Sequence, residues 1–140
     1  MRAYLVRQTS DAAAAGRVAR HLKSCQLGQV EIWRSKDAEA VKTAEAYSAQ
    51  VGKDGSMSDR EELANAASAT SVADRVKALD HDVMVVAQQP VLHGLTAALI
   101  KHSDPKVFRE MPAGGYWIVE PDKSGAWHVT ATCAPEQVAS

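Results

Sequence analysis

Three short apolar runs, each followed by polar residues, organise the first two thirds of the chain. They predict strands near residues 2–7, 29–34 and 82–87. The third run, Val83 to Val86, is continuously apolar, which is typical of a parallel strand covered on both faces. Segments with a helical period follow the strands, so we expect the three strands to be parallel and central in one sheet.

Apolar residues with helical spacing follow each of the first two expected strands. The first helix is expected to begin at a cap provided by Ser10 or Asp11. Its apolar face falls at i, i+3, i+7 and i+10: Ala15, Val18, Leu22 and Cys25. A second helix is expected over 35–51, with Gly52 just past its end as the stop signal.

The middle of the chain has weaker patterns. Residues 53–68 show no periodicity, and we expect them to form a surface excursion around Leu63. Ser71 and Asp74 have capping-box spacing and predict the start of a third helix. The positions of that helix expected to point inward are Val72, Val76 and Leu79.

The last apolar strand of the parallel set is followed by a fourth helical pattern. Pro90 is expected at the first position of this helix, which should end near His102. The positions of this helix expected to be buried are Leu92, Leu95, Leu99 and Ile100.

The C-terminal third predicts an antiparallel hairpin. Residues 116–119 are apolar, residues 121–125 form a turn pattern, and Trp127, Val129 and Ala131 then alternate with polar residues. The fold class expected is therefore a single three-layer α/β/α domain over residues 1–140, with a mostly parallel central sheet and a C-terminal antiparallel hairpin.

Composition narrows the function classes. The 140 residues carry 16 Lys+Arg against 17 Asp+Glu, a net charge of −1, which gives no bias toward nucleic acid. The apolar run Val83–Ala87 is far shorter than the roughly 18 residues of a membrane span, so no membrane partner is expected. Cys25 and Cys133 are expected to be reduced thiols, and the expected location is the cytoplasm.

Common cofactor and metal motifs do not occur in the sequence. There is no GxxxxGK[ST] pattern, and the turn after the first expected strand contains no glycine to cradle a nucleotide phosphate. There is also no HExxH or CxxC pattern. We therefore expect neither a cofactor nor a metal, and the expected ligand is a protein partner or a small anion.

Candidate chemistry lies where the expected strands end, because open α/β sheets bind ligands outside the carboxyl ends of their strands. Arg7, Gln8 and Thr9 follow the first strand, and Gln88 follows the third. The residues considered for a pocket or an anion site are Arg7, Thr9, Arg34, Ser35, Lys36 and His93.

Three stretches at these places resemble the histidine phosphatase superfamily (phosphoglycerate mutase-like). The superfamily's opening strand, which ends in Arg-His-Gly, is similar to Tyr4-Leu-Val-Arg-Gln-Thr9. Its Ser-Pro-x-x-Arg-Ala-x-Gln-Thr-Ala helix start is similar to Ser35-Lys-Asp-Ala-Glu-Ala-Val-Lys-Thr-Ala44. Its segment with the second histidine, Val-Gly-His-x-Pro, is similar to Val85-Val-Ala-Gln-Gln-Pro90. Chain length and the closing hairpin are most similar to the small SixA-type phosphohistidine phosphatases.

The resemblance implies that the catalytic residues have been replaced. In the superfamily the first histidine becomes phosphorylated, while two arginines and a second histidine hold the phosphoryl oxygens. The matching positions hold Gln8 for the first histidine, Arg7 and Glu39 for the two arginines, and Gln88 for the second histidine. An amide cannot form a phospho-intermediate, so the resemblance implies a degenerate, catalytically inactive domain that acts as a binding or regulatory module.

Two alternatives stay open beside this interpretation. The chain could be a phosphohistidine or small phosphoester hydrolase with relocated groups, in which His93 acts with Arg7 and Lys36. Alternatively, Gln8 and Gln88 are polar groups that hydrogen-bond to each other and to backbone. We also predict an ion pair between Arg7 and Glu39, since the resemblance implies that both side chains converge on one centre. The competing interpretation of Glu39 is a solvated residue at a positive helix N-terminus.

Overall fold

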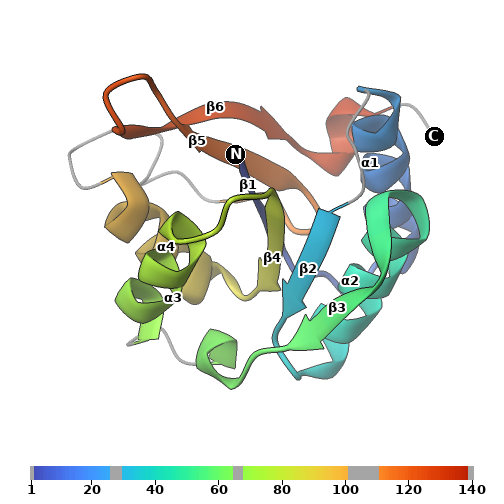
Figure 1. Cartoon of the computed structure of the whole chain (residues 1–140). Coiled ribbons are helices and arrows are strands. Elements are labelled where there is room, and N and C mark those ends of the chain that lie inside the picture. Colours follow the sequence, from blue (N-terminus) through green and yellow to red (C-terminus); the bar gives the residue numbers. More distant parts are fainter. Residues whose placement is uncertain (1, 26–29, 65–67, 101–110, 139–140) are drawn as a thin grey trace.

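The computed structural model describes residues 2–25, 30–64, 68–100 and 111–138. It contains a six-stranded sheet with strand order β3-β2-β4-β1-β5-β6 (Figure 1). The strands are β1 (Ala3–Arg7), β2 (Val30–Arg34), β3 (Gly52–Asp59), β4 (Val83–Ala87), β5 (Tyr116–Pro121) and β6 (Trp127–Cys133). The helices are α1 (Ala12–Ser24), α2 (Ala38–Val51), α3 (Ala69–Lys77) and α4 (Gln89–Ile100), with short 3₁₀ turns η1 (Glu61–Ala64) and η4 (Pro135–Gln137).

The three strands predicted from the apolar runs are parallel and interior to the sheet. β4 lies between β1 and β2 and pairs in parallel with both. All five of its residues are buried, as expected for a strand covered on both faces. The predicted central position of the Val83 to Val86 segment is confirmed.

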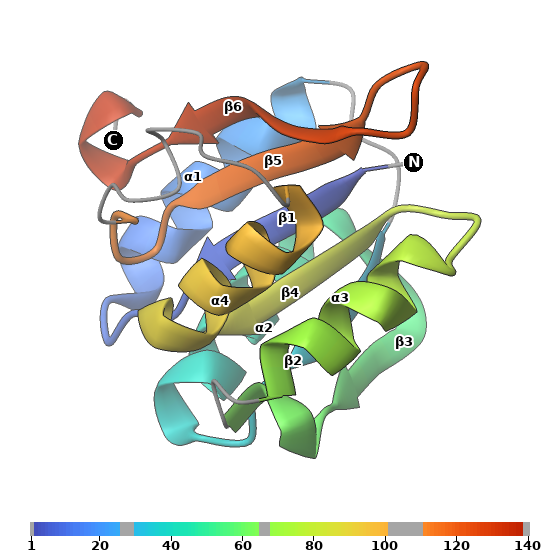
Figure 2. The same ribbon diagram turned by 90° about the vertical axis from the view of Figure 1, so that its left-hand side faces the viewer.

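Helices cover both faces of the sheet, which gives the three layers predicted (Figure 2). Alternate residues of the central strands point to opposite faces. Tyr4, Val6, Met84 and Val86 pack with α1 and α2. Their sequence neighbours in the same strands pack with α3 and α4 on the other face. The fold class predicted from the sequence is confirmed.

The region predicted to be a surface excursion is partly a strand. β3 pairs in parallel with β2 at the edge of the sheet, with Ile32 opposite Met57 and Trp33 opposite Ser58. The prediction failed here because an edge strand faces solvent and needs no apolar periodicity. Leu63, the expected anchor of this region, is fully buried in η1.

Three predicted helix starts are corrected. α2 begins after Asp37 as N-cap rather than at Ser35. α3 begins at Ala69, before the proposed capping box, and its N-cap Ser68 makes no side-chain cap hydrogen bond. Ala69 is buried, so packing rather than a local cap sets where α3 starts. Pro90 is the second residue of α4, not the first.

Most predicted inward positions of the helices are buried, with small exceptions. Cys25 lies past the end of α1 as its C-cap and is exposed, while Asp11 is the N-cap. Leu79 is only partly buried. The remaining predicted positions are buried: Ala15, Val18, Leu22, Val72, Val76, Leu92, Leu95, Leu99 and Ile100. The predicted end of the fourth helix near His102 lies outside the described residues.

The C-terminal hairpin is antiparallel, as predicted, and contains a bulge. Ile118 pairs with Ala131 but Val119 pairs with Val129, so one residue of β6 is extra. The bulge ends the alternation, and Ala131 is exposed although Trp127 and Val129 are buried. Among the described residues, no helix combines the length and apolarity needed to cross a membrane.

Candidate functional site

The carboxyl ends of β1, β2 and β4 meet at one edge of the sheet, which we call the carboxyl edge. The backbone N–H of Gln8 donates to the carbonyl of Ala87 at 3.0 Å, and that of Ser35 donates to Val86 at 3.0 Å. The loops after β1 and β2 are therefore both fastened to the end of β4. The three stretches that carry the resemblance lie together in space.

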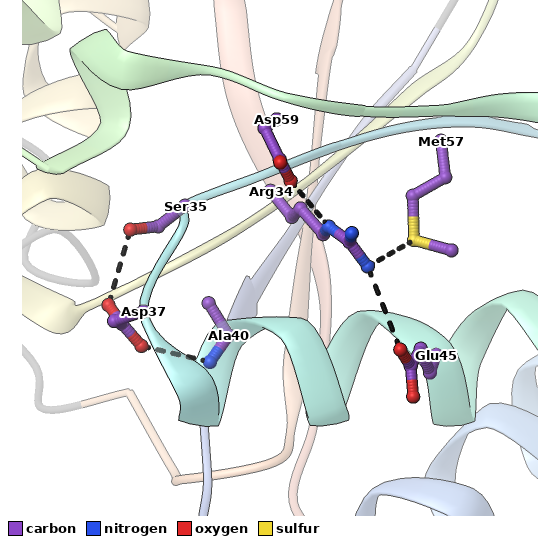
Figure 3. Close-up of polar contacts among 7 residues, drawn as sticks. All are labelled: Arg34, Ser35, Asp37, Ala40, Glu45, Met57 and Asp59. Carbon is purple, nitrogen blue, oxygen red and sulfur yellow. Dashed lines mark hydrogen bonds and ion pairs between the residues drawn. The ribbon is translucent and has the colours of Figure 1, made fainter.

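Asp37 links two of these stretches. As N-cap of α2, its Oδ1 accepts from the backbone N–H of Ala40 at 3.0 Å. Its Oδ2 accepts from the hydroxyl of Ser35 at 3.2 Å and from Nε2 of Gln88 at 3.5 Å, the latter at the long limit of a hydrogen bond (Figure 3 shows the first two). Asp37 was not a predicted site residue, although an Asp directly before a helical pattern is a recognisable cap signal.

Thr43 fastens the loop after β1 to α2. Its hydroxyl oxygen accepts from the backbone N–H of Thr9 at 2.9 Å. The same oxygen lies 3.1 Å from the carbonyl of Thr9 and 2.7 Å from that of Glu39, and its proton can be donated to either. Thr43 is fully buried and Thr9 nearly so. This hydroxyl is therefore a structural link beneath the carboxyl edge.

Arg7 is held by the segment that precedes β5. Its Nη1 donates to the carbonyl of Met111 at 2.6 Å, and its own carbonyl accepts from the N–H of Gly114 at 2.9 Å. Gly114 has φ +80°, a conformation that favours glycine, and Tyr47 donates to its carbonyl at 2.7 Å. A Cβ on Gly115 would collide with the carbonyl oxygen of Cys133. The double glycine therefore lets this segment pass close to Arg7.

The predicted ion pair between Arg7 and Glu39 is not formed in the described part of the chain. Arg7 turns toward Met111, whereas Glu39 is exposed in the first turn of α2. A carboxylate at that place is stabilised by the positive end of the helix and needs no cation across the edge. The competing interpretation of Glu39 as a solvated first-turn residue describes its position.

The two glutamines do not hydrogen-bond to each other, contrary to one of the expectations. Gln88 is exposed and reaches Asp37. Gln8 is partly buried, and its Oε1 is buried with no hydrogen-bond partner among the described residues. The backbone of Gln8, rather than its side chain, connects it to the strand that precedes Gln88.

Arg34 at the end of β2 and Lys36 just after it do not form a free cationic rim. Arg34 contacts Asp59 at 2.7 Å and Glu45 at 4.0 Å (Figure 3). Lys36 pairs with Glu61 at 2.9 Å, and this hydrogen bond raises the pKa of the Lys36 ammonium, which stays charged. Each of these cations therefore has a carboxylate partner on β3, α2 or η1.

His93 lies on α4 and is partly buried. Its Nε2 is buried and has no hydrogen-bond partner within the described residues. His93 does not line the cleft that contains Arg7, and Lys36 is paired with Glu61. The structure thus does not bring His93, Arg7 and Lys36 into one described pocket.

Arg7 and Thr9 line a cleft of about 660 Å³ between α1, the segment after Met111 and η4. The other charged residues in it are Asp11, Arg17 and Glu136. Arg17 and Glu136 were not predicted, because one lies on a helix face and the other near the C-terminus. The described residues bring together no group of three or more His, Cys, Asp or Glu side chains that could hold a metal ion.

No family model matches the sequence, and no curated protein matches it significantly. The structure is similar to the protein histidine phosphatase SixA, solved as a complex with tungstate: the TM-score is 0.81 at 18% identity, over 98% of this chain and 99% of that one. The chain has the fold of the SixA-type histidine phosphatases.

Other solved structures support the same conclusion. A candidate phosphohistidine phosphatase SixA from Agrobacterium tumefaciens gives a TM-score of 0.77 at 20% identity, over 95% of this chain and 97% of that one. A phosphoglycerate mutase from Plasmodium falciparum gives 0.72 at 15% identity, over 93% and 88%. The resemblance stated from three short stretches is thus confirmed at the level of the fold.

Proposed function

We propose that this chain is a degenerate histidine-phosphatase-like domain that has lost catalysis and acts in the cytoplasm as a binding or regulatory module. The observation that carries the proposal is the meeting of three strand ends at the carboxyl edge, where the resemblance implies the catalytic histidines and an arginine. The residues at those positions are Gln8, Gln88 and Glu39.

The chemistry of these residues supports loss of phosphoryl transfer. A glutamine amide has no basic lone pair, so Gln8 cannot attack phosphorus and carry the phosphoryl group. Gln88 can donate a hydrogen bond but cannot change its protonation state. No residue at the two histidine positions can therefore form a phospho-intermediate.

The charge at the third position supports the same conclusion. Two unit charges about 4 Å apart interact by roughly 4 kcal/mol at an effective dielectric near 20, and solvent reduces this for an exposed group such as Glu39. The sign is nonetheless reversed relative to an arginine, so Glu39 repels a phosphate dianion. Arg7 alone, held by Met111, is a weak basis for a phosphoryl site.

The test is a phosphatase assay with a phosphohistidine peptide and p-nitrophenyl phosphate, combined with mass spectrometry of the protein. We expect no turnover above the buffer blank and no phosphorylated protein. The matched comparison is the triple variant Gln8→His, Glu39→Arg, Gln88→His, in which a gain of turnover would show that these positions carry the lost chemistry. Gln8→His alone should stay inactive, since such residues act as a unit.

The alternative function is a phosphohistidine or small phosphoester hydrolase with relocated groups. The observation in its favour is the buried Nε2 of His93, which has no hydrogen-bond partner among the described residues. Turnover by the unmodified protein that disappears in His93→Ala would support this alternative and refute the inactive domain. Turnover that survives His93→Ala would contradict both accounts.

A further inference from the structure

A row of side chains on α1 faces the C-terminal segment. Residues three or four apart on a helix lie on the same face, and this row extends from Asp11 to Ser24, about 20 Å at 1.5 Å per residue. Its members that line hollows are Asp11, Ala14, Arg17, Arg20, His21 and Ser24. The opposite wall is η4 and Val138, which run beside α1 (Figures 1 and 2).

Two hollows lie along this row. The first is the cleft of about 660 Å³ that begins at Arg7, and the second has about 320 Å³ and is lined by Arg20, Gln137 and Val138. Arg17 lines both, so the two hollows are neighbours on one surface. We call them together the α1–η4 groove, defined by the row on α1 and by residues 135–138.

Among the described residues, the arginines of α1 in this groove have no internal counter-ion. In the described part of the chain, neither Arg17 nor Arg20 forms an ion pair or a side-chain hydrogen bond, and Arg17 is partly buried. A guanidinium that is partly desolvated without a partner is favourably satisfied by a carboxylate, which it can bind through two parallel hydrogen bonds. The groove is therefore prepared for a negatively charged group.

The groove also contains apolar surface and acidic residues. Met111, Pro112 and Pro135 line the first hollow beside Arg7. Asp11 uses one carboxylate oxygen to cap α1, whereas Glu136 is exposed. A continuous row of phosphates would meet both carboxylates, but a polypeptide can place its acidic side chains at the arginines and apolar ones elsewhere.

We propose that the α1–η4 groove binds an extended acidic segment of a partner protein, with its carboxylates on Arg17 and Arg20 and its apolar side chains near Met111 and Pro135. This rests on the proposed function, since it names the partner of the binding module. At about 3.3 Å per residue, a groove of about 20 Å accommodates roughly six extended residues. A single phosphate or carboxylate ion would fill only a small part of it.

The test uses fluorescence anisotropy with a labelled eight-residue peptide that carries five Asp or Glu and three Leu or Val residues. The double variant Arg17→Glu, Arg20→Glu should raise the Kd about tenfold or more, because each reversal replaces an attraction by a repulsion. Lys23→Glu is the control: it makes one such charge reversal on α1 outside the groove lining and should alter the Kd less than about twofold. Arg17→Lys, Arg20→Lys should weaken binding less than the double charge reversal, because it keeps both positive charges but loses the paired hydrogen bonds of each guanidinium.

Each outcome decides the inference, provided that circular dichroism shows the variants to be folded. No saturable binding of the peptide up to about 1 mM, or equal losses in Lys23→Glu and the double variant, would overturn it. A single-stranded RNA decamer that binds more tightly with the same dependence on Arg17 and Arg20 would assign a different occupant. Displacement of the peptide by equimolar inorganic phosphate would reduce the groove to a simple anion site.

The inference and the proposed function can fail separately. Phosphatase assays on the same preparations report on catalysis, whereas the anisotropy contrast between the double variant and Lys23→Glu reports on the groove. Turnover with an intact groove contrast would refute only the inactive domain. No turnover with no groove contrast would refute only the acidic partner.

Discussion

The carboxyl edge and the α1–η4 groove are both rich in polar and charged side chains, but their charges are balanced differently. At the edge, Arg34 and Lys36 each contact a carboxylate. The carboxylate of Asp37 accepts hydrogen bonds from three donors. In the groove, Arg17 and Arg20 have no such partner among the described residues. A ligand at the edge must compete with contacts that the chain already makes, whereas a ligand in the groove need not.

This difference suggests that the polar residues of the edge stabilise the fold, whereas those of the groove bind a ligand. Edge residues connect the ends of β1, β2 and β4 to α2, and we expect their loss to lower the free energy of unfolding. Groove residues make few contacts, and we expect their loss to change binding with little effect on stability. Three predictions test this distinction, starting with the largest effect, and a fourth concerns a contact outside both regions.

Thr43→Val should destabilise the protein most. It leaves the buried N–H of Thr9 without its acceptor, which costs about 1–3 kcal/mol of unfolding free energy. Thr96→Val is the matched control, because Thr96 is equally buried but its hydroxyl only donates to the carbonyl of Leu92 in its own helix. Chemical denaturation should show less than about half the loss in the control. Equal losses would show that the link beneath the edge has no special role.

Asp37→Ala should cause the next largest loss of unfolding free energy. It removes the cap of α2, typically about 1 kcal/mol, together with the acceptor of Ser35 and Gln88. Asp11→Ala removes the corresponding cap of α1, with the same 3.0 Å hydrogen bond, and serves as the comparison. Thermal unfolding should show a larger loss for Asp37→Ala. Asp11→Ala should in addition tighten acidic-peptide binding, because it removes a carboxylate from the groove.

Glu136→Lys should strengthen binding of the acidic peptide by about two- to fivefold without changing stability. The substitution replaces a repulsive group in the groove by an attractive one. Glu61→Lys makes the same change in charge on another exposed residue, at the carboxyl edge, and should leave the Kd unchanged. Equal gains would mean that the peptide responds to net charge rather than to the groove.

His81→Gln should have the smallest effect on the free energy of unfolding. His81 lies outside both the carboxyl edge and the α1–η4 groove. Hydrogen bonds to Glu31 and then to Asp80 raise the pKa of His81 above its ordinary 6.5. The stabilisation is therefore complete below about pH 6.5 and is lost as the pH rises through the raised value. For exposed groups it should not exceed about 0.5 kcal/mol. Denaturation at several pH values should show this dependence disappear in His81→Gln and shrink in Glu31→Gln, where the contact between His81 and Asp80 remains.

The sequence predicted the parts of the fold that depend on strong local patterns. The apolar run of β4 predicts a buried strand within the sheet. The spacing of Leu92, Leu95 and Leu99 predicts a helix with one face packed against the sheet. β3 could not be found, since its pairing with β2 is made by backbone and its side chains carry little pattern. The start of α3 at Ala69 could not be found either, because packing rather than a cap defines it.

The sequence predicted where the candidate site lies but not which contacts its side chains make. The carboxyl ends of parallel strands must share an edge, so the meeting of Gln8, Ser35 and Gln88 near one another followed from the order of elements. The partners of Arg7 and Glu39 could not be predicted, because the order of the elements does not specify the distances between side chains. Arg7 took the carbonyl of Met111, more than a hundred residues away.

The sequence by itself therefore determined the alternation of strands and helices and the identities of the residues at the three strand ends, since these depend on local periodicity and on chemical type. Only the tertiary structure decided which charges are paired. Arg34, Lys36 and Arg17 are the same kind of cation in the sequence, yet the approach of β3 and η1 supplies carboxylates to the first two. The packing of η4 on α1 brings Glu136 into the same cleft as Arg17, but among the described residues no carboxylate forms an ion pair with Arg17, because pairing depends on distances that chain order does not specify.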